Sequence, residues 1–146
     1  MPRPLQPDGR VHGVVVAVRR DDGRLLCIRR SYTVAAPGKV CFPGGAIEVG
    51  EEQHAAVIRE MREELGIEAR PLKQCWFWEN PVTPLTLWGW TADWLSGELQ
   101  PAPAEVAEVH WLTEPEVIEH VDAMPSNRGF VASLCFEETK TTLEPK

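Results

Sequence analysis

The chain has 146 residues, of which 43% are hydrophobic and 25% are charged, which is typical of an ordinary globular protein. A chain of this length can bury well over half of its surface around one core, so we expect a single domain over residues 1–146, with a flexible tail from about residue 138. The formal net charge of −7 repels polyanions, and no basic stripe offsets it. A nucleic-acid polymer is therefore not an expected partner.

Membrane and secretory classes are not favoured either. The longest wholly apolar run, Val14–Val18, is far too short to cross a bilayer. The first four residues, Met-Pro-Arg-Pro, lack the apolar stretch of a secretory signal. We expect a cytoplasmic protein without a membrane partner. Its thiols should be reduced, because no CxxC or Cys/His spacing joins the four cysteines Cys27, Cys41, Cys75 and Cys135.

The first half of the chain predicts two strands and one long helix. Val11–Arg19 and Arg24–Arg30 are rich in β-forming residues and flank the sequence Asp-Asp-Gly, which is a hairpin signal. We expect these two segments to be neighbouring strands. A short apolar piece, Val40–Phe42, lies between Pro-Gly breaks. Glu51–Leu65 then runs without glycine or proline and predicts a helix.

The second half predicts more strands and a shorter helix. Leu72–Trp78, Leu85–Leu95 and Val106–Leu112 have the composition of strands. Glu114–Val121 follows Thr113, a good N-cap residue, and carries a proline in its first turn, which predicts a second helix. The order of elements indicates an α+β fold in which strands predominate and two helices pack on them.

The long helix has two neighbouring faces of different character. Four apolar residues fall on one arc that should face the sheet: Val57, Ile58, Met61 and Leu65. Three carboxylates share the adjoining arc: Glu60, Glu63 and Glu64. Like charges at this spacing destabilise a helix unless a cation lies between them, and Mg²⁺ prefers oxygen ligands. The alternative is a solvated helix in which Arg59 and Arg62 pair with the glutamates and no metal binds.

The spacing of residues before and within the helix favours a metal site over a solvated helix. Gly45 is followed after five residues by Glu51, and after seven more by the run from Arg59 to Ile67. This pattern resembles the Nudix box, G-x5-E-x7-R-E-U-x-E-E-x-G-U with U apolar, and it departs from the box at no position. A chance match of its seven fixed residues has a probability on the order of 10⁻⁸ per start position. Gly66 also lies where the helix should end, as a C-cap.

The resemblance to the Nudix family implies a fold in which a mixed β-sheet is sandwiched between α-helices. It implies Mg²⁺-dependent hydrolysis of a diphosphate bond, with Mn²⁺ as a possible substitute. The resemblance assigns metal ligation to the box glutamates, with Arg59 orienting a glutamate, and thus marks Glu51, Arg59, Glu60, Glu63 and Glu64 as catalytic. Gly45 is a candidate ligand through its main-chain carbonyl, because a glycine lets the backbone approach a metal closely.

The family commonly recruits one further acid from a loop opposite the helix. Glu105 and Glu108 are the candidates, and alignment through Trp111 favours Glu105 as metal ligand or general base. Glu63 is the next candidate for the base.

Outside the box, short segments resemble the MutT-type nucleotide pyrophosphohydrolases, which remove oxidised guanine nucleotides from the pool. Their likeness implies a small nucleotide substrate and substrate contacts by Arg30, Phe42 and Asn127. Arg30 could instead be a solvated charge at a strand end, and the sequence Pro-Ser-Asn that contains Asn127 could be an ordinary turn. Trp76 with Trp78, and Trp88 with Trp90, could stack on a base, although core packing is expected for most of the tryptophans.

The sequence does not identify the substrate. Oxidised dGTP, ordinary nucleoside triphosphates, ADP-ribose and dinucleoside polyphosphates all contain the required bond, and fold and box do not choose among them. A nucleotide sensor that binds without cutting is the second class of function, although such domains usually lack some of the box carboxylates. A purely structural protein is the third class, and metal-dependent release of phosphate or pyrophosphate would exclude it.

Overall fold

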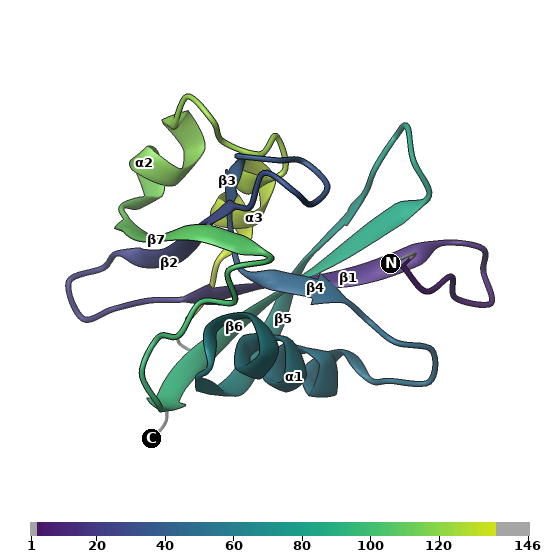
Figure 1. Ribbon diagram of the computed structural model, residues 1–146, viewed down its shortest axis with the longest axis horizontal. Helices are drawn as coiled ribbons and strands as arrows, with labels where there is room; N and C mark the ends of the chain where they lie inside the picture. The colour runs from purple at the N-terminus through teal and green to yellow at the C-terminus, as the bar shows by residue number, and fades with distance from the viewer. Residues whose placement is uncertain (1–2, 137–146) are drawn as a thin grey trace, which may run out of the picture.

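A computed structural model describes residues 3–136, so the tail expected from about residue 138 lies outside the described residues. The strands form two sheets, one with the order β4-β1-β6-β5 and one with the order β3-β2-β7 (Figure 1). Their bounds are β1 (Val11–Val18), β2 (Leu25–Arg30), β3 (Val40–Cys41), β4 (Gly44–Ala46), β5 (Glu68–Glu79), β6 (Leu85–Ser96) and β7 (Val106–Leu112). The helices are α1 (Gln53–Leu65), α2 (Glu114–Glu119) and α3 (Asn127–Ser133).

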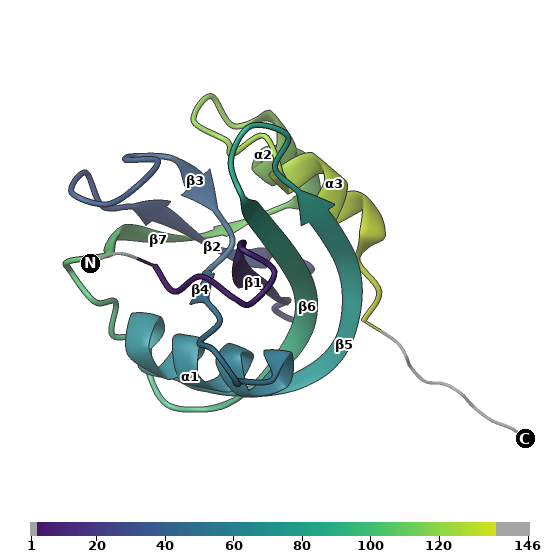
Figure 2. The ribbon, with the colours of Figure 1, turned by 90° about the vertical axis from the view of Figure 1, so that its right-hand side faces the viewer.

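The layers agree with the expected α+β fold. Strand β1 pairs in parallel with β6 and antiparallel with β4, so the larger sheet is mixed. Helix α1 lies on one side of the central strands, and α2 and α3 lie on the other (Figure 2). Within residues 3–136, no helix is long and apolar enough to cross a membrane.

The expectation that β1 and β2 are neighbouring strands of one hairpin is wrong. A tight turn does join them, with the Gly23 amide donating to the Arg20 carbonyl at 2.8 Å. Beyond the turn, the described residues show a single bridge between the strands, from Arg19 to Leu25. Both edges of β1 are occupied, by β4 and by β6, so β2 joins the second sheet and pairs there with β3 and β7.

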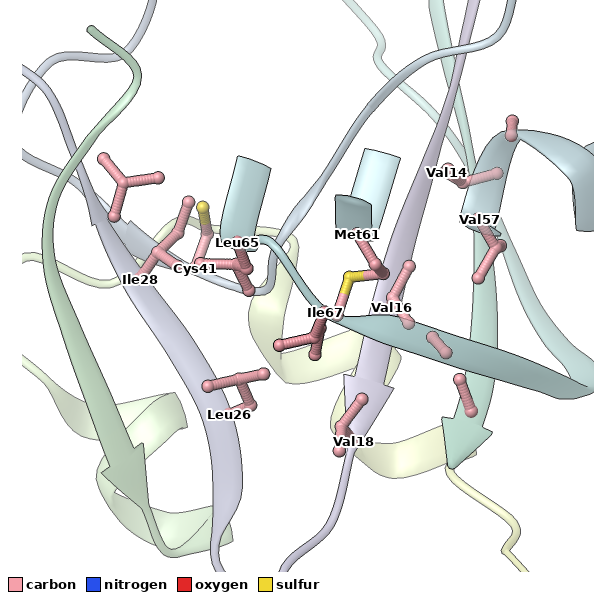
Figure 3. Close-up of a cluster of buried hydrophobic side chains, with 14 of the residues drawn as sticks. Val14, Val16, Val18, Leu26, Ile28, Cys41, Val57, Met61, Leu65 and Ile67 are labelled. Atoms are coloured by element: carbon pink, nitrogen blue, oxygen red, sulfur yellow. The ribbon is translucent and has the colours of Figure 1, made fainter. Parts of the chain in front are cut away.

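The core follows the alternation of side chains along β1. One face of β1 packs against α1 in a cluster that Figure 3 shows, and the other face packs against α2 and α3. The apolar arc of α1 lies in the first cluster as expected, with Val57, Met61 and Leu65 fully buried. Ile58, at the margin of that arc, is only half-buried. The residues of β1 on the α1 face are Val14, Val16 and Val18.

The helix ends confirm two of the predicted caps. Gly66 has φ 72°, and the amide of Ile67 donates back to the Met61 carbonyl at 3.3 Å, which closes the C-terminus of α1. Thr113 caps α2 through its hydroxyl, which accepts from the Glu116 amide at 3.3 Å, and the Glu116 carboxylate accepts from the Thr113 amide at 2.8 Å. Helix α2 ends at Glu119, two residues earlier than expected.

Two short elements were missed, and one strand is longer than expected. Strand β4 contains two glycines, and helix α3 begins in the Pro-Ser-Asn sequence and contains Gly129, so neither has a strong local signal. Gly129 lies close to Trp76, and a Cβ there would make a tight contact of 3.2 Å with the indole nitrogen. Strand β5 starts at Glu68 and passes through Pro71, which is tolerated because β5 is an edge strand with an irregular register there.

Candidate active site

Helix α1 directs two of its glutamates toward the glycines of β4. Glu60 is 9% exposed and Glu64 is 4% exposed, one helical turn apart. The amide of Gly44 donates to Oε1 of Glu64 at 2.9 Å. The side chain of Glu63 is 59% exposed, so the third carboxylate of the expected cluster points to solvent.

The two glycines of β4 are needed for this contact. A Cβ on Gly45 would lie 2.3 Å from the carboxyl carbon of Glu60, and a Cβ on Gly44 would lie 1.9 Å from the carbonyl oxygen of Val14. A side chain at Gly45 would therefore displace the Glu60 carboxylate, and a side chain at Gly44 would meet the main chain of β1.

Arg59 holds this region together by five hydrogen bonds. Its guanidinium binds both oxygens of Glu51, at 2.8 and 2.9 Å, and the Ala46 carbonyl at 2.9 Å. One nitrogen also reaches Glu60 at 2.9 Å and Glu63 at 3.1 Å. The bonds from Arg59 lower the pKa of Glu51, which keeps that carboxylate ionised. Four of the box residues thus form one network that fixes the orientation of Glu60.

The two buried glutamates are poorly compensated. Burial raises the pKa of Glu64 to about 8, against the Gly44 amide and the charge of Arg30, which act in the opposite direction. Burial also raises the pKa of Glu60, with Arg59 opposing. A desolvated carboxylate with few partners is the environment that a divalent cation would stabilise. The donor set, two carboxylates with hard oxygens, fits Mg²⁺ or Mn²⁺.

This set is not a closed metal cage. Among residues 3–136, no three His, Cys, Asp or Glu side chains converge on a ready-made cation position. Mg²⁺ is usually held by one or two protein carboxylates and completes its shell with waters and substrate phosphates. Two buried carboxylates that face the side-chain-free backbone of Gly44 and Gly45 match that mode of binding.

The two acids considered outside the box occupy different surroundings. Glu105 immediately precedes β7, and its negative charge raises the pKa of both Glu60 and Glu64, so the three carboxylates interact through space. Glu108 is bound to Arg29 at 3.0 Å and to His110 at 2.8 Å. These partners lower the pKa of Glu108 and engage it in an ion-pair group on the surface. The surroundings therefore favour Glu105 for a role at the site.

Arg30 lies at the edge of the same site. Its Nε donates to the Ala35 carbonyl at 2.6 Å, and its charge acts on both the Cys41 thiol and the Glu64 carboxylate. It is half-buried at the end of β2 and is not simply a solvated charge. Burial raises the pKa of Cys41 to about 11, so this neighbouring thiol stays protonated.

Phe42 and Asn127 lie on the α3 side of the molecule. Phe42 is 4% exposed and packs edge-to-face on Phe130, with ring centroids 4.7 Å apart. Asn127 is 3% exposed, and its amide nitrogen donates to the carbonyls of Val40 at 2.9 Å and Val117 at 3.3 Å. Both hydrogens are thereby engaged in joining α3 to β3 and α2. No group within residues 3–136 donates to its Oδ1.

The tryptophans divide between the two sides. Trp76 stacks on Trp78 with centroids 6.3 Å apart and on Phe130 with centroids 5.3 Å apart, which continues the aromatic group beside Phe42. Trp88 and Trp90 face the α1 side, where their indole nitrogens donate to other side chains at 3.0 and 2.8 Å. Phe130 was not singled out from the sequence, because its place appears only when α3 packs on β5 and β3.

Comparisons with known proteins identify the family of the chain. The NUDIX domain family matches residues 9–134 of the chain. The 8-oxo-dGTP diphosphatase of Escherichia coli strain K12 is 31% identical over 119 residues, which cover 80% of this chain and 90% of that protein. The NAD-capped RNA hydrolase NudC of Escherichia coli O1:K1 is 35% identical over 98 residues, which cover 67% of this chain but 37% of that longer protein.

Solved structures show the same fold. A MutT NUDIX hydrolase from Burkholderia pseudomallei superposes with a TM-score of 0.75 at 23% identity, covering 86% of this chain and 98% of that one. A MutT protein from Methanosarcina mazei Go1 gives a TM-score of 0.73 at 21% identity, covering 90% and 94% of the two chains. With its complete box, its family match and its relatives among diphosphatases, the chain belongs to the Nudix family and is a pyrophosphohydrolase similar to the MutT type.

Proposed function

We propose that the chain hydrolyses the diphosphate linkage of a nucleoside triphosphate in the cytoplasm, with Mg²⁺ as cofactor and Mn²⁺ as a substitute, and that residues 1–146 act as a single catalytic domain. The observation that carries this proposal is the pair of buried carboxylates, Glu60 and Glu64, pressed against a glycine backbone. Without a counter-charge, that arrangement is costly. It becomes favourable where a divalent cation and a phosphate group bind together.

Glu60, Glu64 and the carbonyl of Gly45 would hold the cation, with Glu105 and Glu63 as additional oxygen donors at its open side. When bound, the ion would neutralise phosphoryl charge and increase the acidity of a water molecule. Arg59 keeps Glu60 in place through its bonds to Glu51 and Ala46, so the donor set is ready before the substrate arrives.

The remaining roles belong to residues around this pair. We assign to Glu105 the removal of a proton from the water that attacks phosphorus, since its carboxylate is exposed yet within electrostatic reach of Glu60 and Glu64. The bond between that phosphorus and its bridging oxygen then breaks. Arg30 would bind a phosphate oxygen, because its guanidinium is close enough to act on the Glu64 carboxylate and its planar donors match phosphate oxygens.

The base is proposed to lie on the α3 side, against Phe42 and near Asn127. Because the amide hydrogens of Asn127 are engaged, the group it can offer is the Oδ1 acceptor. Oxidised guanine carries a hydrogen on N7, whereas ordinary guanine has a lone pair there. An acceptor would therefore favour the oxidised base and repel the normal one. Similarity to an 8-oxo-dGTP diphosphatase over 90% of that protein's length supports the same substrate.

A substrate panel assayed with Mg²⁺ and scored by kcat/KM tests this proposal. The panel holds 8-oxo-dGTP, the four ordinary dNTPs, ADP-ribose, a dinucleoside tetraphosphate and NAD. We expect 8-oxo-dGTP to rank first, with nucleoside monophosphate and pyrophosphate as products. A higher kcat/KM for ADP-ribose or the dinucleoside tetraphosphate would refute the substrate assignment. Binding of nucleotides without any turnover would identify the domain as a sensor and refute the enzymatic proposal.

A further inference from the structure

The segment that carries Glu105 is attached to the end of helix α1. The amide of Gln100 donates to the Leu65 carbonyl at 2.7 Å, and the amide of Ala102 donates to the Glu64 carbonyl at 2.9 Å. These carbonyls belong to the last turn of α1 and have no partner within the helix. The loop between β6 and β7 is therefore joined to the main chain of Glu64, whose side chain lies in the candidate site.

A second attachment comes from the loop after β2. The amide of Ser31 donates to the carbonyl of Glu105 at 2.9 Å. The Ser31 hydroxyl lies 3.0 Å from the Thr33 hydroxyl and accepts from the Thr33 amide at 3.2 Å. The Thr33 hydroxyl in turn donates to the Ala104 carbonyl at 3.4 Å. Ser31 is 8% exposed and Thr33 is exposed, so this pair of hydroxyls extends from the buried part of the contact between the two loops to its surface.

The Glu105 residue itself is exposed, so packing around its side chain does not fix its position. The main-chain bonds from Ser31 to Glu105 and from Ala102 to Glu64 therefore decide where its carboxylate can lie. The charge of Glu105 acts on both Glu60 and Glu64, which places it near the pair.

We propose that Ser31 and Thr33 are positioning residues that hold Glu105 in reach of Glu60 and Glu64. This inference rests on the proposed function, in which Glu105 takes a proton or completes the cation's ligands. Ser31 also follows Arg30 directly, so the same short segment fixes the phosphate-binding arginine and the loop of the acid. The hydroxyl pair thereby joins the end of β2, where Arg30 lies, to the loop just before β7, where Glu105 lies.

The kinetic test uses Ser31→Ala and Thr33→Val, each alone and combined with Glu105→Gln. Misplacing a catalytic group lowers turnover more than substrate binding, so we expect each single variant to lower kcat by about 10-fold, with KM changed less than about twofold. In the Glu105→Gln background, the same substitutions should lower kcat no further. Matched controls are Ser133→Ala, which removes an exposed hydroxyl bond within α3, and Thr83→Val in the turn after β5.

Two outcomes of this cycle would overturn the proposal. One is an unchanged kcat in both single variants. The other is full additivity with Glu105→Gln, which would mean that the hydroxyls act on something other than the acid. Thr33 is exposed, so Thr33→Val should fold even if Ser31→Ala does not, and a thermal melt of each variant establishes this before the kinetics are read.

Two measurements without turnover separate this inference from the proposed function. Amide hydrogen exchange of Ser31 and Ala102 reports the two attachments, and a titration with Mn²⁺, followed by the electron paramagnetic resonance of the free ion, reports the carboxylates. We expect faster exchange at Ser31 and weaker Mn²⁺ binding in Ser31→Ala and Thr33→Val. If the wild type cleaves no diphosphate, the proposed function is wrong. The Mn²⁺ titration still tests whether Ser31 and Thr33 position Glu105. Unchanged Mn²⁺ affinity in both variants would then overturn the positioning role.

Discussion

Helices α1 and α3 lie on opposite sides of the central strands and present different chemistry (Figure 2). Helix α1 brings two buried carboxylates, Glu60 and Glu64, against bare backbone, an arrangement that is electrostatically unfavourable on its own. Helix α3 brings a buried amide and an aromatic ring, Asn127 and Phe130. Neighbouring carbonyls accept both amide hydrogens of Asn127, and other rings pack against Phe130, while Oδ1 of Asn127 accepts no hydrogen bond within residues 3–136.

The difference indicates where each part of the function lies. Buried, poorly compensated carboxylates are expected where the reaction takes place, because the binding of a cation and a phosphate group offsets the free-energy cost of burying their charge. Well-packed apolar side chains with one open acceptor are expected where a ligand is recognised by shape and by one hydrogen bond. The α1 side should therefore control kcat, and the α3 side should control the choice of nucleotide. Four predictions separate the two sides, beginning with the largest effect.

Replacing Glu64 by Gln keeps the shape of the side chain and removes its charge. We expect kcat to fall by at least about 10²-fold, which corresponds to about 3 kcal/mol of transition-state stabilisation. The melting temperature of the metal-free protein should change little below about pH 8, because Glu64 is then protonated and Gln replaces it with a neutral side chain of the same shape. The control is Glu63→Gln, whose side chain is exposed, and its effect should be much smaller. Wild-type kcat in Glu64→Gln would mean that the α1 carboxylates are not the reaction site.

Glu105→Gln should slow catalysis by about 10- to 100-fold with little loss of stability, since an exposed general base contributes to rate and not to packing. Glu108→Gln is the matched control three residues along the chain. It should leave kcat near the wild-type value, because Glu108 is engaged by Arg29 and His110 on the surface. Steady-state kinetics and thermal melts of both variants test this. A larger kcat defect in Glu108→Gln would reverse the assignment.

The pKa of Glu64 predicts how pH acts on the metal-free protein. Between about pH 4.5, its ordinary pKa, and about pH 8, folded Glu64 keeps a proton that the unfolded chain has lost. The free energy of unfolding should therefore fall as pH rises through this window, by at most about 1.4 kcal/mol per pH unit for this group, and level off above it.

Mg²⁺ needs the ionised form, so its stabilising effect should be larger at pH 8 than at pH 6. Thermal melts with Mg²⁺ and with EDTA across this range provide the measurement. In Glu64→Gln, the pH dependence of the Mg²⁺ effect should largely disappear. A wild-type protein whose Mg²⁺-induced rise in melting temperature is the same at both pH values would contradict the assignment of the cation to this carboxylate.

Asn127→Ala should act on the α3 side. We expect the ratio of kcat/KM for 8-oxo-dGTP to that for dGTP to fall by about 10-fold, the effect of losing one discriminating hydrogen bond. Stability should fall by about 1–3 kcal/mol as well, because the carbonyls of Val40 and Val117 lose their partner. Asn80→Ala is the control, since Asn80 also makes two side-chain hydrogen bonds, in the turn after β5. Equal kcat/KM for the two nucleotides in the wild type would refute a base-reading role.

The same contrast explains how much could be predicted from the sequence. The α1 side is encoded locally: the spacing of three and four residues places Glu60 and Glu64 on one face, and Gly66 ends the helix as expected. Even there, the sequence grouped Glu63 with the buried pair, whereas Arg59 holds it at the solvent side. Helical periodicity gives the angle of a side chain around the helix axis but not the depth to which it is buried.

The α3 side depends on contacts between distant segments. In the sequence, Asn127 is typical of a turn. In the structure it is buried and joins α3 to β3 and α2, because carbonyls of those two elements accept its amide hydrogens. The separation of β1 from β2 has the same origin, since β6, about 70 residues later, occupies the edge that a hairpin would use. Likewise Ser31 and Glu105 meet only in the folded chain. Pairings of this kind have no local signal that a single sequence could reveal.

The most direct test of the central claim is the hydrolysis of 8-oxo-dGTP by the wild-type protein and by Glu64→Gln, each with Mg²⁺ and with excess EDTA, followed by release of pyrophosphate. If the carboxylates of α1 are the reaction site, wild-type turnover will require Mg²⁺, recover on its return, and fall by at least about 10²-fold in Glu64→Gln. Full turnover in EDTA, or equal rates in the two proteins, would contradict that claim.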